Sequence, residues 1–275
     1  MSWLWEPLQF AFMQRALLMA ILVGSLCAVV GSYLMVQRLA LLGDAISHTV
    51  LPGLAIAFWL GGNIYVGAFI AGILSTLLIT GIQRFSSLKA DTAMGIVLSG
   101  GFALGVTLIT LIQSQNRIDL NHFLFGNILS VSTAEVISAA VMTFIVLAVI
   151  RLFYKELLFY TFDPVGAAAA GLPVDRLHWG LMVLVALTVV MSMKSIGVIL
   201  VIALLITPSA TAYLLVKQLH HVMAVAVGIG LVGSIGGMYL SYYLNIPSGP
   251  GIVLLLTGFF ILVWLAGIPK YRQSG

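Results

Sequence analysis

The sequence predicts an all-α protein, a polytopic bundle of helices that crosses a lipid bilayer many times. Three observations lead to this prediction: charged residues are scarce, uncharged apolar stretches recur along the chain, and glycine is frequent within those stretches. The first observation concerns the solvent, the second the topology and the third the packing of the helices.

Composition decides which solvent surrounds the chain. Of 275 residues, 61% are hydrophobic and 7% are charged, and the mean hydropathy is +1.17. A soluble domain carries about 25% charged residues, because its surface faces water. The net charge of +4 is small and scattered, so it provides no surface for nucleic acid. The single cysteine, Cys27, excludes an internal disulfide or cysteine metal cluster.

Spanning helices need about 20 mostly apolar residues. Uncharged stretches lie at 16–37, 49–62, 63–83, 93–113, 134–150, 177–193, 195–216, 222–244 and 249–268, which predicts nine spans. The second stretch is short for a full crossing, so we expect it to be broken or tilted, and eight spans are the alternative. No basic region with a cleavage site precedes the first stretch, which is expected to stay as an anchor. Residues 1–275 then form a single transmembrane domain.

Basic residues give the expected orientation of the bundle. With nine alternating crossings, one set of loops holds nine basic residues and the opposite set holds three, Arg15, Arg117 and Lys194. Loops rich in lysine and arginine stay in the cytoplasm. The C-terminus is therefore expected inside and the N-terminus outside.

Glycine accounts for 28 residues. Small residues let helices approach closely in a membrane, where no hydrophobic effect drives their association. Gly101 and Gly105 have the spacing of such a contact, as do Gly233 and Gly237. We expect these pairs to pack within one bundle, with a contact between two copies of the chain as the alternative.

Two ionisable residues lie within apolar sequence near the second stretch. Asp44 and His48 are four residues apart, so on a helix their side chains share one face and can meet. Ionisable groups near hydrocarbon cost several kcal/mol and usually line a cavity or pathway. A carboxylate with an imidazole suits Mn²⁺, Fe²⁺ or Zn²⁺. The alternative is an ion pair or helix cap at the end of the first span, and the spacing does not decide between them.

The residues after this pair indicate a change of direction. Pro52 and Gly53 fit either a broken helix that lines a cavity or an ordinary turn. Asp119 and His122, in the predicted external loop 114–133, are weaker candidates for metal ligands at an entrance, or they are solvated loop residues.

A short helix is predicted in the cytoplasmic loop 151–176. Asp163 can cap a helix, Pro164 suits its first position, alanines follow, and Gly171 and Pro173 end it. So short a helix needs a surface to pack against. That surface is either a cytoplasmic partner or the bundle and the lipid headgroups.

Together these residues resemble the ABC-3 family of metal-importer permeases. The resemblance covers about 10–268 and rests on the segments Gly43–His48 with Leu51–Gly53, Phe125–Gly126, Gly197–Ala212 and Asp163–Gly171. It implies a type II ABC importer permease in the bacterial inner or plasma membrane. It also implies a homodimer with two cytoplasmic ATP-binding subunits and an external metal-binding protein.

The resemblance also assigns roles to residues of this sequence. Asp44 and His48 become pathway ligands for a divalent cargo, Mn²⁺ favoured over Zn²⁺ and Fe²⁺, and no permanent cofactor is expected. The residues that couple the chain to the ATPase are Asp163, Pro164, Ala167 and Gly171. Those that break or pack helices are Pro52, Gly53, Gly197 and Pro208. The family often has an acidic residue where this chain has Val165, which leaves the docking contacts open.

Three other functions are weighed against this one. A permease for a siderophore or cobalamin chelate would not need Asp44 and His48, and an ion-coupled secondary transporter would not need an ATPase. An intramembrane hydrolase is disfavoured, because Ser47 and His48 are adjacent and cannot act on each other across a helix face. The chain has no phosphate-binding loop motif, so the ATPase must be another subunit.

Overall fold

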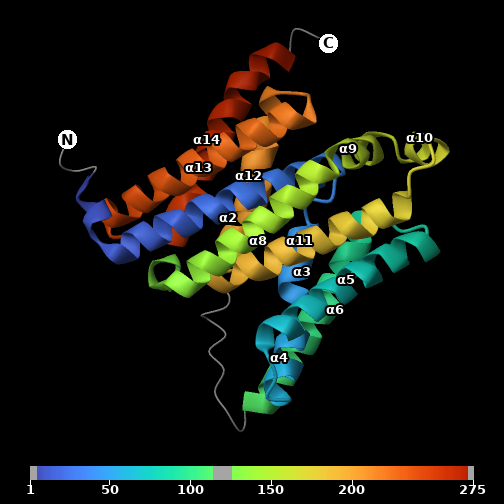
Figure 1. Ribbon diagram of the computed structural model, residues 1–275, viewed down its shortest axis with the longest axis horizontal. Helices are drawn as coiled ribbons and strands as arrows, with labels where there is room; N and C mark the ends of the chain where they lie inside the picture. Colours follow the sequence, from blue (N-terminus) through green and yellow to red (C-terminus); the bar gives the residue numbers. More distant parts are fainter. Residues whose placement is uncertain (1–4, 114–125, 272–275) are drawn as a thin grey trace.

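The computed structural model describes residues 5–113 and 126–271, and within them all regular structure is helical (Figure 1). In this part of the chain eight helices are long and apolar enough to span a bilayer. These are α2 (Ala11–Val36), α5 (Ile64–Phe85), α6 (Ala90–Gln113), α8 (Thr133–Leu152), α11 (Val174–Ile196), α12 (Val198–Leu215), α13 (Leu219–Leu244) and α14 (Ser248–Tyr271). The short ones are η1 (Pro7–Gln9), α3 (Leu42–Thr49), α4 (Leu51–Trp59), η2 (Ile128–Ser130), α9 (Tyr154–Phe162) and α10 (Pro164–Ala169).

The count of continuous spans is therefore the alternative, eight, rather than nine. The difference lies in the predicted stretch 49–62, which is not one helix but the end of α3 and the whole of α4. Pro52 has no N–H group and cannot bond to the carbonyl of His48, so the helix is interrupted there. Val50, between the two helices, keeps helical angles of φ −74° and ψ −18°, so α4 follows α3 directly.

One group of helices, α2, α8 and α11–α14, forms what we call the body. Helix α2 is central to the body, because 72% of an 18-residue hydrophobic segment of this helix is buried. Gly31 of α2 lies so close to α12 that an added Cβ would overlap the backbone carbonyl of Leu205. Ser209 of α12 donates a hydrogen bond of 3.1 Å to the carbonyl oxygen of Ala28. The body is thus held together by backbone-to-backbone approach.

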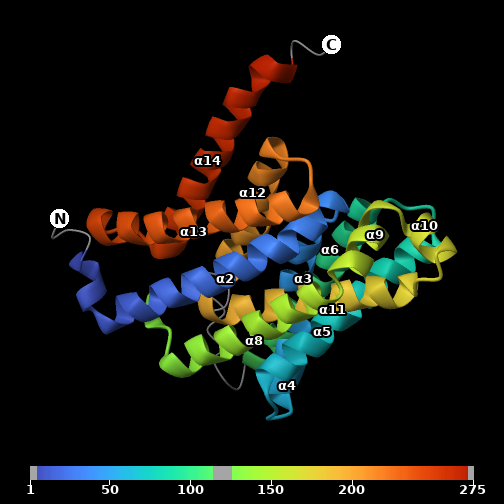
Figure 2. The ribbon, with the colours of Figure 1, turned by 45° about the horizontal axis from the view of Figure 1, so that its top comes forward.

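Helices α4, α5 and α6 form a second group, the arm, whose α4 end extends away from the body in both views (Figures 1 and 2). Only 11% of the corresponding 18-residue hydrophobic segment of α6 is buried within the chain. Gly53 of α4 and Gly67 of α5 pack so closely that a Cβ on either would overlap the other's backbone. The helices of the arm pack on one another around an open apolar pocket of about 820 Å³, and the arm joins the body through α3 and α5.

The two predicted glycine pairs pack inside the chain. A Cβ on Gly101 would lie 2.5 Å from Cγ2 of Thr49, and one on Gly105 would lie 2.5 Å from Cβ of Leu51. Helix α6 therefore crosses the α3–α4 junction through small residues. Gly233 and Gly237 of α13 pack in the same way against α14. The alternative, a contact between two copies, is not needed to explain either pair.

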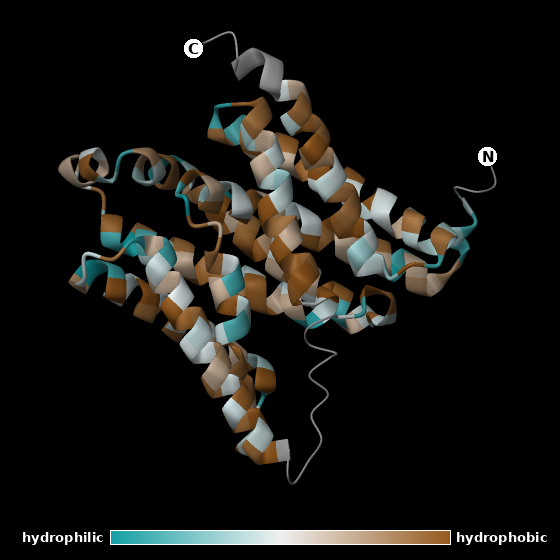
Figure 3. Ribbon diagram, turned by 180° about the vertical axis from the view of Figure 1, so that it is seen from behind, coloured by the Kyte–Doolittle hydropathy of each residue, from teal (hydrophilic) through white to brown (hydrophobic). Residues whose placement is uncertain are grey.

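Hydropathy follows the helices as expected for a membrane protein. In Figure 3 hydrophobic residues run along the long helices, and most hydrophilic residues gather at helix ends and connections. A helix satisfies its own backbone hydrogen bonds, so it can lie in lipid with such a surface.

Candidate functional site

Asp44 and His48 meet on one face of α3. Nε2 of His48 lies 3.4 Å from Oδ1 of Asp44. The side chain of His48 is 26% exposed and that of Asp44 is 32% exposed. The imidazole also packs edge-on against Phe102 of α6, with ring centroids 5.3 Å apart. Nδ1 of His48 is buried and has no hydrogen-bond partner among the described residues. The pair therefore places a carboxylate oxygen beside the Nε2 ring nitrogen, whereas Nδ1 is buried.

The surroundings of the pair hold α3 between the body and the arm. Gly43 faces the body, since an added Cβ would lie 3.1 Å from Cδ2 of Leu205. Thr49 faces the arm, where its side chain packs against Gly101. The hydroxyls of Ser47 and Thr49 donate to carbonyls of their own helix, at 2.9 and 2.7 Å. Ser47 and Thr49 are buried, whereas the side chains of Asp44 and His48 are partly exposed.

The described residues contain no group of three His, Cys, Asp or Glu side chains that could hold a metal ion. With Asp44 and His48 as two ligands, a cation between them would need others from water or another chain. Asp119 and His122, the predicted entrance residues, lie outside the described residues, as does Phe125.

Three separate motifs of the sequence come together around Gly197–Ala212. Leu205 lies beside Gly43 of the first motif. Gly126, the described residue of the second motif, packs against the Ile196–Gly197 backbone so closely that a Cβ would overlap it. Both Gly126 and Gly197 have positive φ, 59° and 81°, which glycine tolerates best. Pro208 lies inside α12 and is buried.

Helix α10 has the local chemistry that its sequence predicts. Oδ1 of Asp163 accepts a 2.8 Å hydrogen bond from the N–H of Gly166, and Pro164 is the first helical residue. Gly171 follows the helix with φ 82°. Ala167 is fully buried within the chain, whereas Val165 is 80% exposed. Any partner of α10 would therefore contact Val165 and its exposed neighbours rather than Ala167.

The structure adds a polar junction that the sequence does not reveal. His178 of α11 contacts Oη of Tyr160 in α9 through Nδ1, at 2.8 Å, and Oγ1 of Thr80 in α5 through Nε2, at 3.2 Å. Beside it, Arg84 of α5 forms an ion pair with Asp175 of α11. Burial raises the pKa of Tyr160 above its ordinary value, so its hydroxyl keeps a proton. The partners are 18 to 98 residues apart, and no local pattern indicates them.

Comparison with known proteins gives consistent matches over nearly the whole chain. The sequence model described as the ABC 3 transport family matches residues 9–267. A probable iron transport system membrane protein of Haemophilus influenzae is 45% identical over 261 residues, 95% of this chain and 96% of that protein. A manganese transport system membrane protein of Listeria monocytogenes is 43% identical over 258 residues, 94% of this chain and 91% of that protein.

A solved structure resembles the fold equally well. PsaBC from Streptococcus pneumoniae, in complex with Fab, superposes with a TM-score of 0.84 at 40% sequence identity. The match covers 96% of this chain and 94% of that chain. Both parts of the molecule, the body and the arm, therefore have counterparts in a known structure.

Proposed function

The chain belongs to the ABC 3 transport family, and from this we propose that it is the membrane-spanning permease of an ATP-driven importer of divalent metal ions. Manganese is the favoured cargo, ahead of zinc and iron. Several relatives are named as manganese transport or import proteins and others as iron transport proteins. The site agrees with this range, since a carboxylate and an imidazole suit all three metals.

The Asp44–His48 pair is the observation that carries the proposal. The two side chains lie side by side at the junction of the body and the arm, with Nε2 of His48 3.4 Å from Oδ1 of Asp44. A carrier must hold its cargo weakly enough to release it. Two protein ligands, completed by water or by a second copy of the chain, meet that requirement better than a closed shell would.

The orientation follows from the two ends of α5 and α11. We place the end with Arg84 and Asp175, next to α9 and α10, in the cytoplasm, and the end with Tyr65 and Lys194 outside. Helices α3 and α4 together cover Leu42–Trp59, about 27 Å of helix at 1.5 Å per residue. They carry the chain across as a broken ninth crossing, which puts the N-terminus outside and the C-terminus inside a bacterial plasma or inner membrane.

The importer needs partners that this chain does not provide. We assign it to a homodimer with two cytoplasmic ATP-binding subunits, supplied by an external metal-binding protein. The ATP-binding subunits contact α10 at Val165 and Ala168, which are exposed in this chain. Movement of α10 reaches α5 and α11 through α9, because Tyr160 of α9 contacts His178, which contacts Thr80. The metal path then opens alternately to the two sides.

Uptake of radioactive Mn²⁺ and Zn²⁺ by cells that express the whole transport system tests the proposal. We expect Asp44→Ala to reduce uptake more than about tenfold, because loss of even an outer-shell group at a metal site costs about 10–100-fold. Asp91→Ala is the matched control, since Asp91 is an exposed aspartate in the first turn of α6. Uptake at the normal rate in Asp44→Ala would refute the site. Uptake of neither metal by the unaltered system would favour a chelate as cargo.

A further inference from the structure

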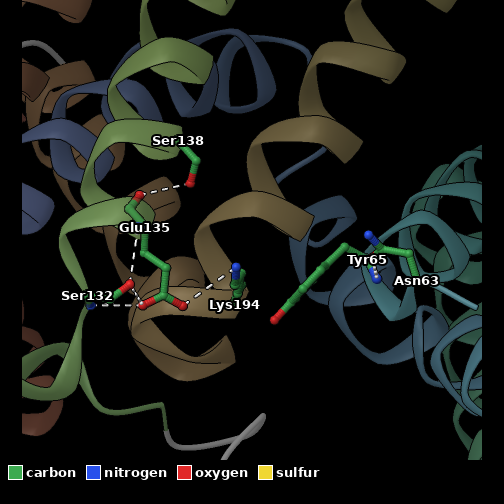
Figure 4. Close-up of polar contacts among 6 residues, drawn as sticks. All are labelled: Asn63, Tyr65, Ser132, Glu135, Ser138 and Lys194. Carbon is green, nitrogen blue, oxygen red and sulfur yellow. Dashed lines mark hydrogen bonds and ion pairs between the residues drawn. The ribbon is translucent and has the colours of Figure 1, made fainter.

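A second charged cluster lies at the ends of three helices, α5, α8 and α11, which we place on the outer side (Figure 4). Nζ of Lys194, in the last turn of α11, lies 3.6 Å from Oε1 of Glu135 in the first turn of α8. The same ammonium group lies 4.2 Å from the ring centroid of Tyr65 in the first turn of α5. The three residues are distant in sequence, so the tertiary fold alone brings them together.

Glu135 is fixed in place by its own helix terminus. Its carboxylate accepts hydrogen bonds of 2.9 Å from both the N–H and the hydroxyl of Ser132, and its own N–H donates to that hydroxyl. Lys194 lies three residues before Gly197, where the connection to α12 packs against Gly126. Glu135 and Lys194 both belong to the body, so their ion pair does not cross to the arm.

Tyr65 is the member of the cluster that belongs to the arm. Its backbone N–H donates a 3.0 Å hydrogen bond to the side chain of Asn63, the N-cap of α5. Two residues after Tyr65, Gly67 packs against Gly53 of α4. Gly53 lies just after the junction of α3 and α4. The contact of Lys194 with Tyr65 therefore joins the body to the outer end of the arm. Within the arm, Tyr65 lies on α5, and α5 packs on α4, the helix that follows α3 and His48.

The two contacts of Lys194 differ in what their rupture would cost. If the end of α5 that carries Tyr65 moves away from α11, Lys194 loses only its cation–π contact. Its charge stays compensated by Glu135. Cation–π contacts of partly exposed groups are among the weaker interactions in proteins. A charge left without a partner in a membrane would be far more costly. This arrangement allows the contact to open and close repeatedly.

We propose that Lys194 is a positioning residue that holds the outer end of the arm against the body through the ring of Tyr65. Opening of the Lys194–Tyr65 contact admits the cargo from the outer face, and its closure prevents the cargo from returning while the inner side opens. Glu135 keeps the ammonium group in place throughout. This inference rests on the proposed metal import, but it concerns a contact that can be measured without any metal.

Hydrogen exchange of the full chain in lipid nanodiscs is the first test. Lys194→Met and Tyr65→Leu should increase exchange over residues 64–72 by about fivefold, the factor expected for the loss of such a contact. Exchange in α13 should not change. Lys194→Arg and Tyr65→Phe keep a cation and an aromatic ring, so both should behave like the unaltered chain. Unchanged exchange in Lys194→Met, or equal effects of Tyr65→Phe and Tyr65→Leu, would overturn the proposal.

The number of Mn²⁺ ions imported per ATP hydrolysed by the intact system is the second test. In Lys194→Met this ratio should fall about fivefold while ATP hydrolysis continues, because the cargo escapes outward. A residue that only stabilises the fold would lower uptake and hydrolysis together, and that result would contradict the positioning role. If the unaltered system imports no Mn²⁺, the proposed function fails, whereas the exchange experiment still decides whether the contact holds the arm.

Discussion

The body and the arm are made of the same apolar residue types, but only the body contains long helices that are half buried or more, namely α2, α11 and α12; its helices α8 and α14 are nearly as exposed as α6 of the arm. In the body, α2 is mostly enclosed and approaches α12 closely enough for Gly31 to meet the backbone at Leu205. In the arm, α6 is mostly exposed, and close packing is confined to the arm's own helices and the α3–α4 junction. The arm meets the body through α3 and through the side of α5 that faces α11.

This difference indicates a division of labour, in which the body keeps its shape and the arm moves against it. A transporter that alternates between two states needs one part that keeps its shape and another that can move against it. Asp44 and His48 lie on α3, which packs against the body at Gly43 and against the arm at Thr49. A small displacement of the arm would therefore change the surroundings of the proposed metal ligands, while the body stays intact. The substitutions below test whether the two parts respond in this way.

The largest effect is expected from Gly31→Ala in the body. The new methyl group would overlap the carbonyl oxygen of Leu205, so α2 and α12 would have to separate along their length. Overpacking of this kind typically costs about 1–3 kcal/mol, and more where backbone must shift. We expect a large loss of folded protein, measured as the thermal unfolding temperature in detergent. Gly228→Ala in α13, where an added Cβ meets nothing within 4 Å, is the control and should unfold normally.

A smaller loss of stability, with a disproportionate loss of transport, is expected from Gly67→Ala in the arm. The methyl group would lie 2.3 Å from the carbonyl oxygen of Gly53 and 2.5 Å from Cβ of Ala57, so it would push α4 away from α5. Since the arm is less enclosed than the body, it can relax, and the cost should fall near the lower end of about 1–3 kcal/mol. Unfolding temperature and Mn²⁺ uptake are measured together.

Gly81→Ala is the matched control for this arm substitution, because it lies in the same helix and an added Cβ meets open space. It should leave both stability and uptake unchanged. If Gly67→Ala lowers the unfolding temperature as much as Gly31→Ala does, the body and the arm form one rigid unit and the division of labour is wrong.

Much of this architecture could be predicted from local sequence, because lipid imposes strict local rules. Apolar stretches of sufficient length predicted the long helices, and Asp163, Pro164 and Gly171 predicted α10 from capping chemistry alone. The short stretch 49–62 was expected to be broken or tilted, with eight spans as the alternative to nine, and it is indeed divided at Pro52 between α3 and α4, which leaves eight long helices in the described residues.

The contacts between distant segments could not be predicted in the same way. The pairing of Asp44 with His48 follows from helical spacing, because both lie on one helix. The contacts of His178 with Thr80 and of Lys194 with Tyr65 depend on which helices become neighbours. Packing between α5 and α11, as where an added Cβ on Gly72 would lie 3.6 Å from Val190, brings these residues together, and the sequence does not specify such partners.

The smallest effect on stability, and the most selective one on transport, is expected from Asp163→Ala. The substitution removes the hydrogen bond to the N–H of Gly166 at the start of α10. Loss of an N-cap costs about 1 kcal/mol, confined here to a helix of six residues outside the body and the arm. The unfolding temperature should therefore stay the same, whereas uptake should fall severalfold because a frayed α10 transmits ATP-driven movement poorly. Asp163→Asn keeps a capping oxygen and should retain uptake; if both substitutions abolish it equally, the charge of Asp163 rather than its cap is what the partner subunit requires.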